Sequence, residues 1–91
     1  MTIRNQIHAG NYQILRNGII IKLFFADYPP AHFHAIYGEY NAIFNLETLE
    51  FIEGDLPNRA IKMVVEWASL YQGELLKMWK DQEFSKLPPL K

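Results

Sequence analysis

The sequence predicts an α+β domain in which a small antiparallel β-sheet of three to five strands, connected by hairpins, precedes two C-terminal helices packed on one face of the sheet. Three observations lead to this prediction. Short apolar runs in the first half are separated by turn residues such as Asn17-Gly18 and Gly38-Glu39. Apolar residues after Pro57 recur instead at helical spacing. The length of 91 residues suits one domain, so residues 1–91 are treated as a single unit.

The expected sheet spans residues 18–53. Asn17-Gly18 favours a hairpin turn, because both residues tolerate a positive φ. Pro29 and Pro30 end the strand before them, since neither can donate a ladder hydrogen bond. The strands predicted from these boundaries are Ile19 to Phe25, His32 to Tyr37, Tyr40 to Leu46 and Leu49 to Glu53. Residues 1–17 are expected to be flexible or to add an edge strand with Tyr12, Ile14 and Leu15.

The two helices are expected within residues 55–84, followed by a tail over residues 85–91. Asp55 can cap free backbone N–H groups, and Pro57 suits a first turn, where its missing donor costs nothing. Gly73 is expected to kink or end the first helix. The buried stripe is predicted to comprise Ile61, Val64, Val65, Ala68 and Tyr71, continued on a second helix by Leu75, Leu76 and Trp79.

The composition excludes several classes of protein. The chain has no cysteine, which rules out disulfides and thiolate metal sites. Nine basic and ten acidic side chains give a formal charge of -1 without a basic cluster, so direct binding of nucleic acid is not expected. No run approaches the roughly 20 apolar residues of a membrane span, and no signal peptide is apparent. We therefore expect a cytoplasmic protein with no membrane contact.

Alternation along the strands predicts a second apolar face. One face would be covered by the helices and carry Ile21, Leu23, Phe25, Phe33, Ala35, Tyr37, Ala42 and Phe44. The other would carry Ile20, Lys22, Phe24, His32, His34, Ile36, Ile43, Asn45 and Ile52, which is more apolar than a solvated face normally is. Such a face should be covered by the N-terminal segment with Tyr12, Ile14 and Leu15, by the C-terminal tail with Phe84, Leu87 and Leu90, or by a second copy or a small partner protein. We favour the last, with an interface formed by Ile20, Phe24, His32, His34, Ile36, Ile43 and Ile52.

His32 and His34 are the residues most suited to metal binding. Two positions apart on a strand, they leave the same face with Cα atoms roughly 7 Å apart. A divalent metal could be held there if Asp27 or Glu39 supplied a third ligand. The alternative is structural: the imidazoles bond backbone carbonyls near the two prolines. No nucleophile, base and orienting group come together in the pattern, so we assign no catalytic residue and no other cofactor.

Arg59 is a candidate for anion binding. It is expected in the first helical turn, close to Asp55. A guanidinium in that place can bind a carboxylate or phosphate. The alternative is a surface ion pair, worth under about 1 kcal/mol.

Several motifs recur in one order along the chain: Ile21 to Phe25 with Asp27, Pro29-Pro30-Ala31-His32-Phe33-His34, Tyr37-Gly38-Glu39-Tyr40, Glu47-Thr48-Leu49-Glu50, Glu53-Gly54-Asp55-Leu56-Pro57 with Arg59 and Ala60, Glu66-Trp67-Ala68, and Glu74-Leu75-Leu76 with Trp79. With them the chain resembles an uncharacterised bacterial family, domain of unknown function 4160. The resemblance implies no established activity. It implies small bacterial proteins encoded beside another small family of unknown function, an arrangement similar to toxin–antitoxin pairs.

Two functional hypotheses follow. The one we favour is a small non-enzymatic interaction or regulatory module that acts with itself or with a small cognate protein, in a toxin–antitoxin-like arrangement. The alternative is a metal-dependent hydrolase or nuclease-like enzyme centred on His32 and His34.

Overall fold

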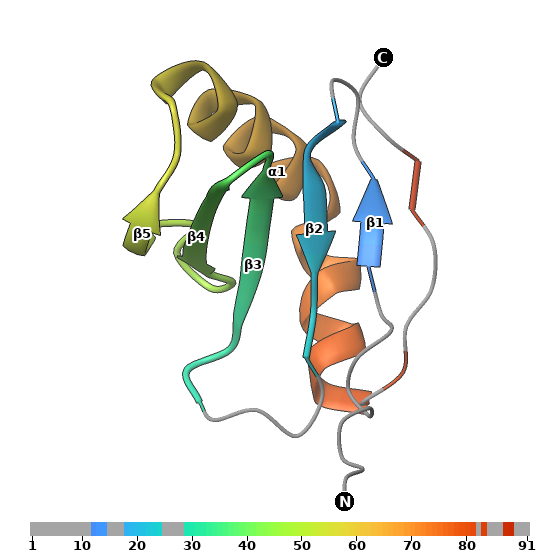
Figure 1. The fold of residues 1–91 in the computed structure, drawn as a ribbon. Helices are drawn as coiled ribbons and strands as arrows, with labels where there is room; N and C mark the ends of the chain where they lie inside the picture. The colour runs from blue at the N-terminus through green and yellow to red at the C-terminus, as the bar shows by residue number, and fades with distance from the viewer. Residues whose placement is uncertain (1–11, 15–17, 25–28, 82, 84–86, 89–91) are drawn as a thin grey trace, which may run out of the picture.

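The computed structural model of the chain describes residues 12–14, 18–24, 29–81, 83 and 87–88. A five-stranded antiparallel sheet packs with one face against a long helix (Figure 1). The elements are β1 (Tyr12–Ile14), β2 (Ile20–Lys22), β3 (His32–Tyr37), β4 (Tyr40–Asn45), β5 (Phe51–Asp55) and α1 (Asn58–Asp81). The strands follow one another in the sheet in the order of the chain. The α+β class and the antiparallel sheet are therefore confirmed.

The connection between β4 and β5 differs from the expected one. The side-chain Oδ1 of Asn45 accepts hydrogen bonds from the N–H groups of Glu47, at 2.7 Å, and Thr48, at 3.0 Å. Leu49 follows in the left-handed region with φ 64°. Because this tight turn extends through Leu49, the last strand begins at Phe51 and not at Leu49.

Gly54 belongs to β5 and not to the start of the helix. It pairs with Ala42, has φ +107°, and a Cβ there would lie 2.8 Å from the Cα of Ala42 and against the carbonyl oxygen of Asn41. Only glycine allows so close an approach. The strand consequently continues to Asp55, which is exposed opposite Asn41. Among the described residues Asp55 accepts no helix N–H, so its predicted capping role is wrong.

The helix begins at Asn58, and the carbonyl of Pro57 accepts the N–H of Ile61 at 2.9 Å. The prediction of two helices is wrong, because one helix runs from Asn58 to Asp81 with a kink at Tyr71 (φ −119°, ψ 19°). A glycine such as Gly73 costs only about 1 kcal/mol inside a helix. Packing on both sides of the kink outweighs that cost, since Trp67 before it and Leu75 after it are buried.

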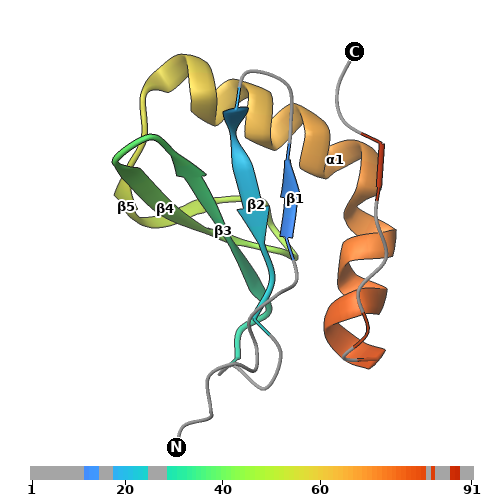
Figure 2. The ribbon, with the colours of Figure 1, turned by 45° about the vertical axis from the view of Figure 1, so that its right-hand side comes forward.

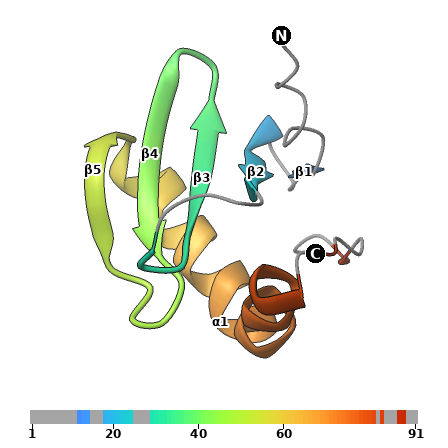
Figure 3. The same cartoon turned by 90° about the horizontal axis from the view of Figure 1, so that it is seen from below.

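The core lies between α1 and one face of the sheet (Figure 2). It contains Ile19, Ile21, Leu23, Phe33, Ala35, Ala42, Phe44, Leu46, Leu56, Ala60, Val64, Trp67, Ala68, Leu75 and Met78. The indole N–H of Trp67 donates to the carbonyl of Pro88 at 2.9 Å, and Leu87 packs against the core. Seen from below, α1 lies on one side of the sheet, and the described part of the tail approaches from that same side (Figure 3).

Candidate functional site

The face of the sheet that turns away from α1 is the first candidate surface. Burial alternates along β2, β3 and β4, so residues between the core positions are half-buried. We call this surface the open face and define it as Ile20, Lys22, Phe24, His32, His34, Ile36, Asn41, Ile43, Asn45, Glu53 and Asp55. Six of the seven expected interface residues lie on it.

Ile52 is the exception. The pairing of β4 with β5 shifts between Ile43 and Phe44, so that Ile43 lies opposite Glu53 and Phe44 opposite Phe51. Ile52 has no place in this register and is 46% exposed. Strict alternation, which placed Ile52 on the open face, is interrupted by this bulge.

The open face is polarised across the strands. One cross-strand row runs Lys22, His34, Ile43, Glu53 from β2 to β5, and we call it the charged row. The next row runs Ile20, Ile36, Asn41, Asp55. The ammonium of Lys22 therefore lies on the β2 side of the open face, and the carboxylates of Glu53 and Asp55 lie on the β5 side. Isoleucine side chains lie between them.

The histidines belong to a chain of ring contacts that we call the histidine cluster, comprising Phe24, His32, His34 and Trp79. Ring centroids are 4.7 Å apart for Phe24 and His34, 5.4 Å for the two histidines, and 5.1 Å for His32 and Trp79. The Nδ1–H of His32 donates to the carbonyl of Pro30 at 2.8 Å, as the structural interpretation of the histidines predicts. The ammonium of Lys22 lies 5.9 Å from the centre of the Phe24 ring, close enough for a cation–π contact.

Sequence reasoning missed the role of Trp79. Helical spacing placed it correctly on the buried side of the helix, where it is half-buried against the core. Its contact with His32 depends on the direction that α1 takes beyond the kink at Tyr71. No local pattern carries that information.

The structure describes three of the four residues of the predicted metal site: His32, His34 and Glu39. Glu39 lies in the turn at the far end of β3, five residues beyond His34, or roughly 16 Å along an extended strand. Glu39 and the two histidines therefore do not come together in the described part of the chain. Asp27 lies outside the described residues. Within the ranges that the structure describes, no three histidine or carboxylate side chains gather closely enough to hold a metal ion.

Arg59 lines a pocket of about 320 Å³ at the opposite end of the sheet from the histidine cluster. The pocket is lined by Ile19, Tyr37, Tyr40, Pro57, Arg59, Ala60 and Met63. The rings of Tyr37 and Tyr40 stack at 6.4 Å, and both are exposed. In the part of the chain that the structure describes, Arg59 forms no ion pair, so the expected pairing with Asp55 is absent. An exposed guanidinium beside two tyrosines could accept a carboxylate, but no buried polar group fixes the position of one.

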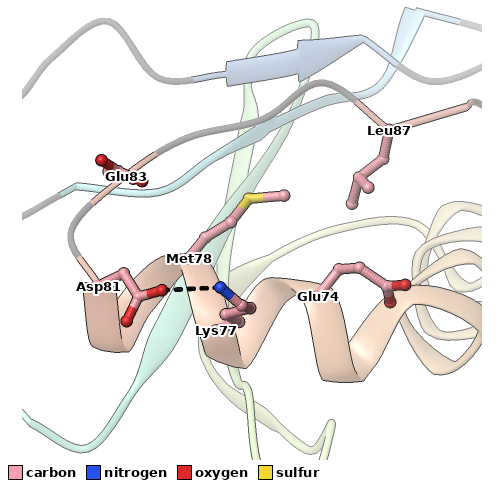
Figure 4. Close-up of a pocket in the computed structure, with 6 residues that line it drawn as sticks. All are labelled: Glu74, Lys77, Met78, Asp81, Glu83 and Leu87. Atoms are coloured by element: carbon pink, nitrogen blue, oxygen red, sulfur yellow. Dashed lines mark hydrogen bonds and ion pairs between the residues drawn. The ribbon is translucent and has the colours of Figure 1, made fainter.

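A smaller pocket of about 110 Å³ lies beside the second half of α1 (Figure 4). Its lining residues are Glu74, Lys77, Met78, Asp81, Glu83 and Leu87. The ammonium of Lys77 donates to Asp81 at 3.0 Å, and this hydrogen bond raises the pKa of Lys77. Because the pair is exposed and one helical turn apart, it is a surface ion pair and does not form a binding site.

Comparisons with known proteins give one match. The family described as Domain of unknown function (DUF4160) matches residues 18–80. No curated protein and no solved structure matches the chain. Among the described residues, no helix combines the length and apolarity needed to cross a membrane. The matched range contains β2 to β5, the whole open face and both histidines. The chain therefore belongs to this family of domains of unknown function.

Proposed function

We propose that this protein is a small non-enzymatic interaction module, regulatory in role, that pairs with itself or with a small cognate protein through the open face. The observation that supports the proposal most strongly is the position of Ile20, Ile36 and Ile43. They are half-buried on the sheet face that turns away from the core beneath α1, and among the described residues α1 reaches this face at His32, through Trp79. Apolar surface of this kind, rimmed by polar residues, marks protein-binding sites.

The chemistry of the surface also favours a protein partner. Each square ångström of apolar surface removed from water contributes about 25 cal/mol, so a flat partner would gain free energy from all three isoleucines together. Lys22 and Glu53, at the two ends of the charged row, would then fix the orientation of the partner. In the arrangement that the family resemblance implies, the small cognate protein is the product of the adjacent gene, as in a toxin–antitoxin pair.

The proposal is tested by capturing that product. The tagged protein is co-expressed with the adjacent gene, and the wild type is compared with Ile43→Glu. The matched control is Leu70→Glu, because Leu70 is an apolar residue that is 62% exposed on α1. We expect the Ile43 variant to lose the complex and the Leu70 variant to keep it, with unchanged circular dichroism for both. Equal capture by all three proteins would exclude the open face as the surface that binds the cognate protein.

One observation supports the alternative, a metal-dependent hydrolase or nuclease-like enzyme. The rings of His32 and His34 are 5.4 Å apart, which allows both to bind one ion. Calorimetric titration with zinc and with manganese tests this. Stoichiometric binding that disappears in His32→Ala and His34→Ala would support the alternative, whereas heats that are equal in all three proteins would dismiss it.

A further inference from the structure

We infer that the open face binds a second copy of this chain across a two-fold axis that runs parallel to the strands, between β3 and β4. The inference rests on the proposed function, because it names the occupant of the same surface. Its basis is the charged row, in which Lys22 on β2 and Glu53 on β5 stand at opposite ends. At strand spacings of about 4.8 Å these ends are roughly 14 Å apart.

A two-fold rotation about this axis turns one open face over onto another. The rotation reverses the order of the strands and preserves position along them. It therefore places β2 over β5 of the second copy and β3 over its β4. Lys22 then faces Glu53 of the second copy, and the symmetry repeats this pair on the other side.

The two central residues of the charged row, His34 and Ile43, are also compatible with this arrangement. His34 faces Ile43 of the second copy, and the two isoleucines lie near the axis. Asp55 stands on the same rim as Glu53 and adds to the negative charge that Lys22 meets. A face-to-face axis perpendicular to the strands would instead stack each strand on its own equivalent. At this row it would set Lys22 against Lys22 and Glu53 against Glu53, so like-charge repulsion disfavours it.

The dimensions suit sheet-on-sheet packing of modest strength. Stacked sheets lie about 10 Å apart, a distance that an extended lysine and an extended glutamate can span together. Four strands of three to six residues make a face of at most roughly 20 Å by 20 Å. That area is below the roughly 800 Å² per partner of a standard interface, so we expect a dimer that dissociates in the micromolar range.

The test is a charge exchange followed by analytical ultracentrifugation at low salt. Lys22→Glu alone sets Glu against Glu, and Glu53→Lys alone sets Lys against Lys. Each single variant should dimerise about tenfold or more weakly than the wild type. A mixture of the two single variants should form a 1:1 heterodimer, since both of its cross-pairs are attractive. The double variant Lys22→Glu with Glu53→Lys should dimerise like the wild type.

Neutral variants cover the case in which a reversed charge impairs folding. Lys22→Gln and Glu53→Gln should each weaken the dimer a few-fold, while Leu70→Glu should leave it unchanged. Single variants that dimerise as the wild type does, or a mixture that stays monomeric, would overturn the inference. A monomeric wild type whose capture of the adjacent gene product is lost in Ile43→Glu would overturn this inference alone. A monomeric wild type with capture unaffected by Ile43→Glu would overturn the proposed function as well.

Discussion

The two faces of the sheet are built from the same strands and differ in the size of the side chains that they present. Beneath α1, one cross-strand row runs Ile21, Ala35, Ala42, Gly54, and we call it the small row. On the open face the neighbouring residues form the charged row, Lys22, His34, Ile43, Glu53. One residue along each strand separates the two rows.

The difference in side-chain size explains why α1 packs on one face of the sheet and not on the other. Both faces are rich in apolar residues, so hydrophobicity alone does not decide between them. Ala35 and Ala42 are fully buried and leave room for α1, while Phe33 and Phe44 fill the space beside them. The open face has a histidine, an isoleucine or a charged group in the corresponding places, which suits a flat partner better than a helix.

The largest expected effect comes from removing a ring beneath the helix. Phe44 is fully buried and stacks on Phe33 at a centroid distance of 5.3 Å. Phe44→Ala should lower the free energy of unfolding by about 3–5 kcal/mol, measured by urea denaturation of dilute, monomeric protein. The control, Ile43→Ala on the open face, should cost on the order of 1 kcal/mol. Equal costs would mean that both faces contribute equally to the core.

The second prediction concerns the glycine of the small row. Gly54→Ala places a Cβ against the carbonyl oxygen of Asn41 at a positive φ, so β5 must move away from β4. The expected loss in the free energy of unfolding is on the order of 3 kcal/mol. Gly38→Ala is the control, because it also has a positive φ, +60°, but meets no atom within 4 Å. It should cost about 1 kcal/mol in the same denaturation experiment, and a Gly54 variant as stable as this control would contradict the close approach.

A third, smaller effect is expected where the tail meets the helix-covered side. Trp67→Phe removes the N–H that bonds the carbonyl of Pro88. We expect a loss of about 1 kcal/mol, together with faster cleavage near the C-terminus in limited proteolysis. Unchanged proteolysis would show that this hydrogen bond does not hold the tail.

Much of the sheet is predictable, because particular residue types such as proline and glycine mark the ends of its strands. The range of β3, His32–Tyr37, agrees with the prediction, since Pro30 precedes it and Gly38 follows it. The start of β5 was not predictable, because the turn at Asn45 depends on a side chain that bonds its own backbone. The prediction also ends the last strand at Glu53, because glycine before an acidic residue and a proline suits a turn into a helix as well as a strand, whereas the structure continues β5 to Asp55.

In the candidate site, too, the features that depend on local sequence were predictable and those that depend on tertiary structure were not. Alternation placed Ile20, Ile36 and Ile43 on the open face, because the direction of a side chain on a strand is a local property. It could not place Glu39 relative to the histidines, since residues close in sequence can lie at opposite ends of a strand. The contact of Trp79 with His32 depends on the direction of α1 beyond the kink at Tyr71, which no local pattern in the sequence predicts.

The smallest expected effect is at the exposed pair on α1. The hydrogen bond to Asp81 raises the pKa of Lys77, so any stability that it adds is present below the pKa of a free lysine, 10.5, and is lost as the pH rises through the raised value. Lys77→Ala should therefore leave the thermal midpoint almost unchanged between pH 6 and 9, within roughly 1 °C. A clear loss at pH 7 would show that this pair matters more than its exposure suggests.

The order of strands in the sheet has a consequence for the kinetics of folding. In the part of the chain that the structure describes, each strand pairs with its neighbours in sequence, so these pairings close short loops. Chains with such local contacts fold quickly, and we expect the strands to meet before α1, the last element, has docked. Both apolar faces are then exposed for a short time, and the helix can reach either. Lys22 and Glu53 make docking on the open face unfavourable, so the charges that would orient a partner also direct the helix to the correct side.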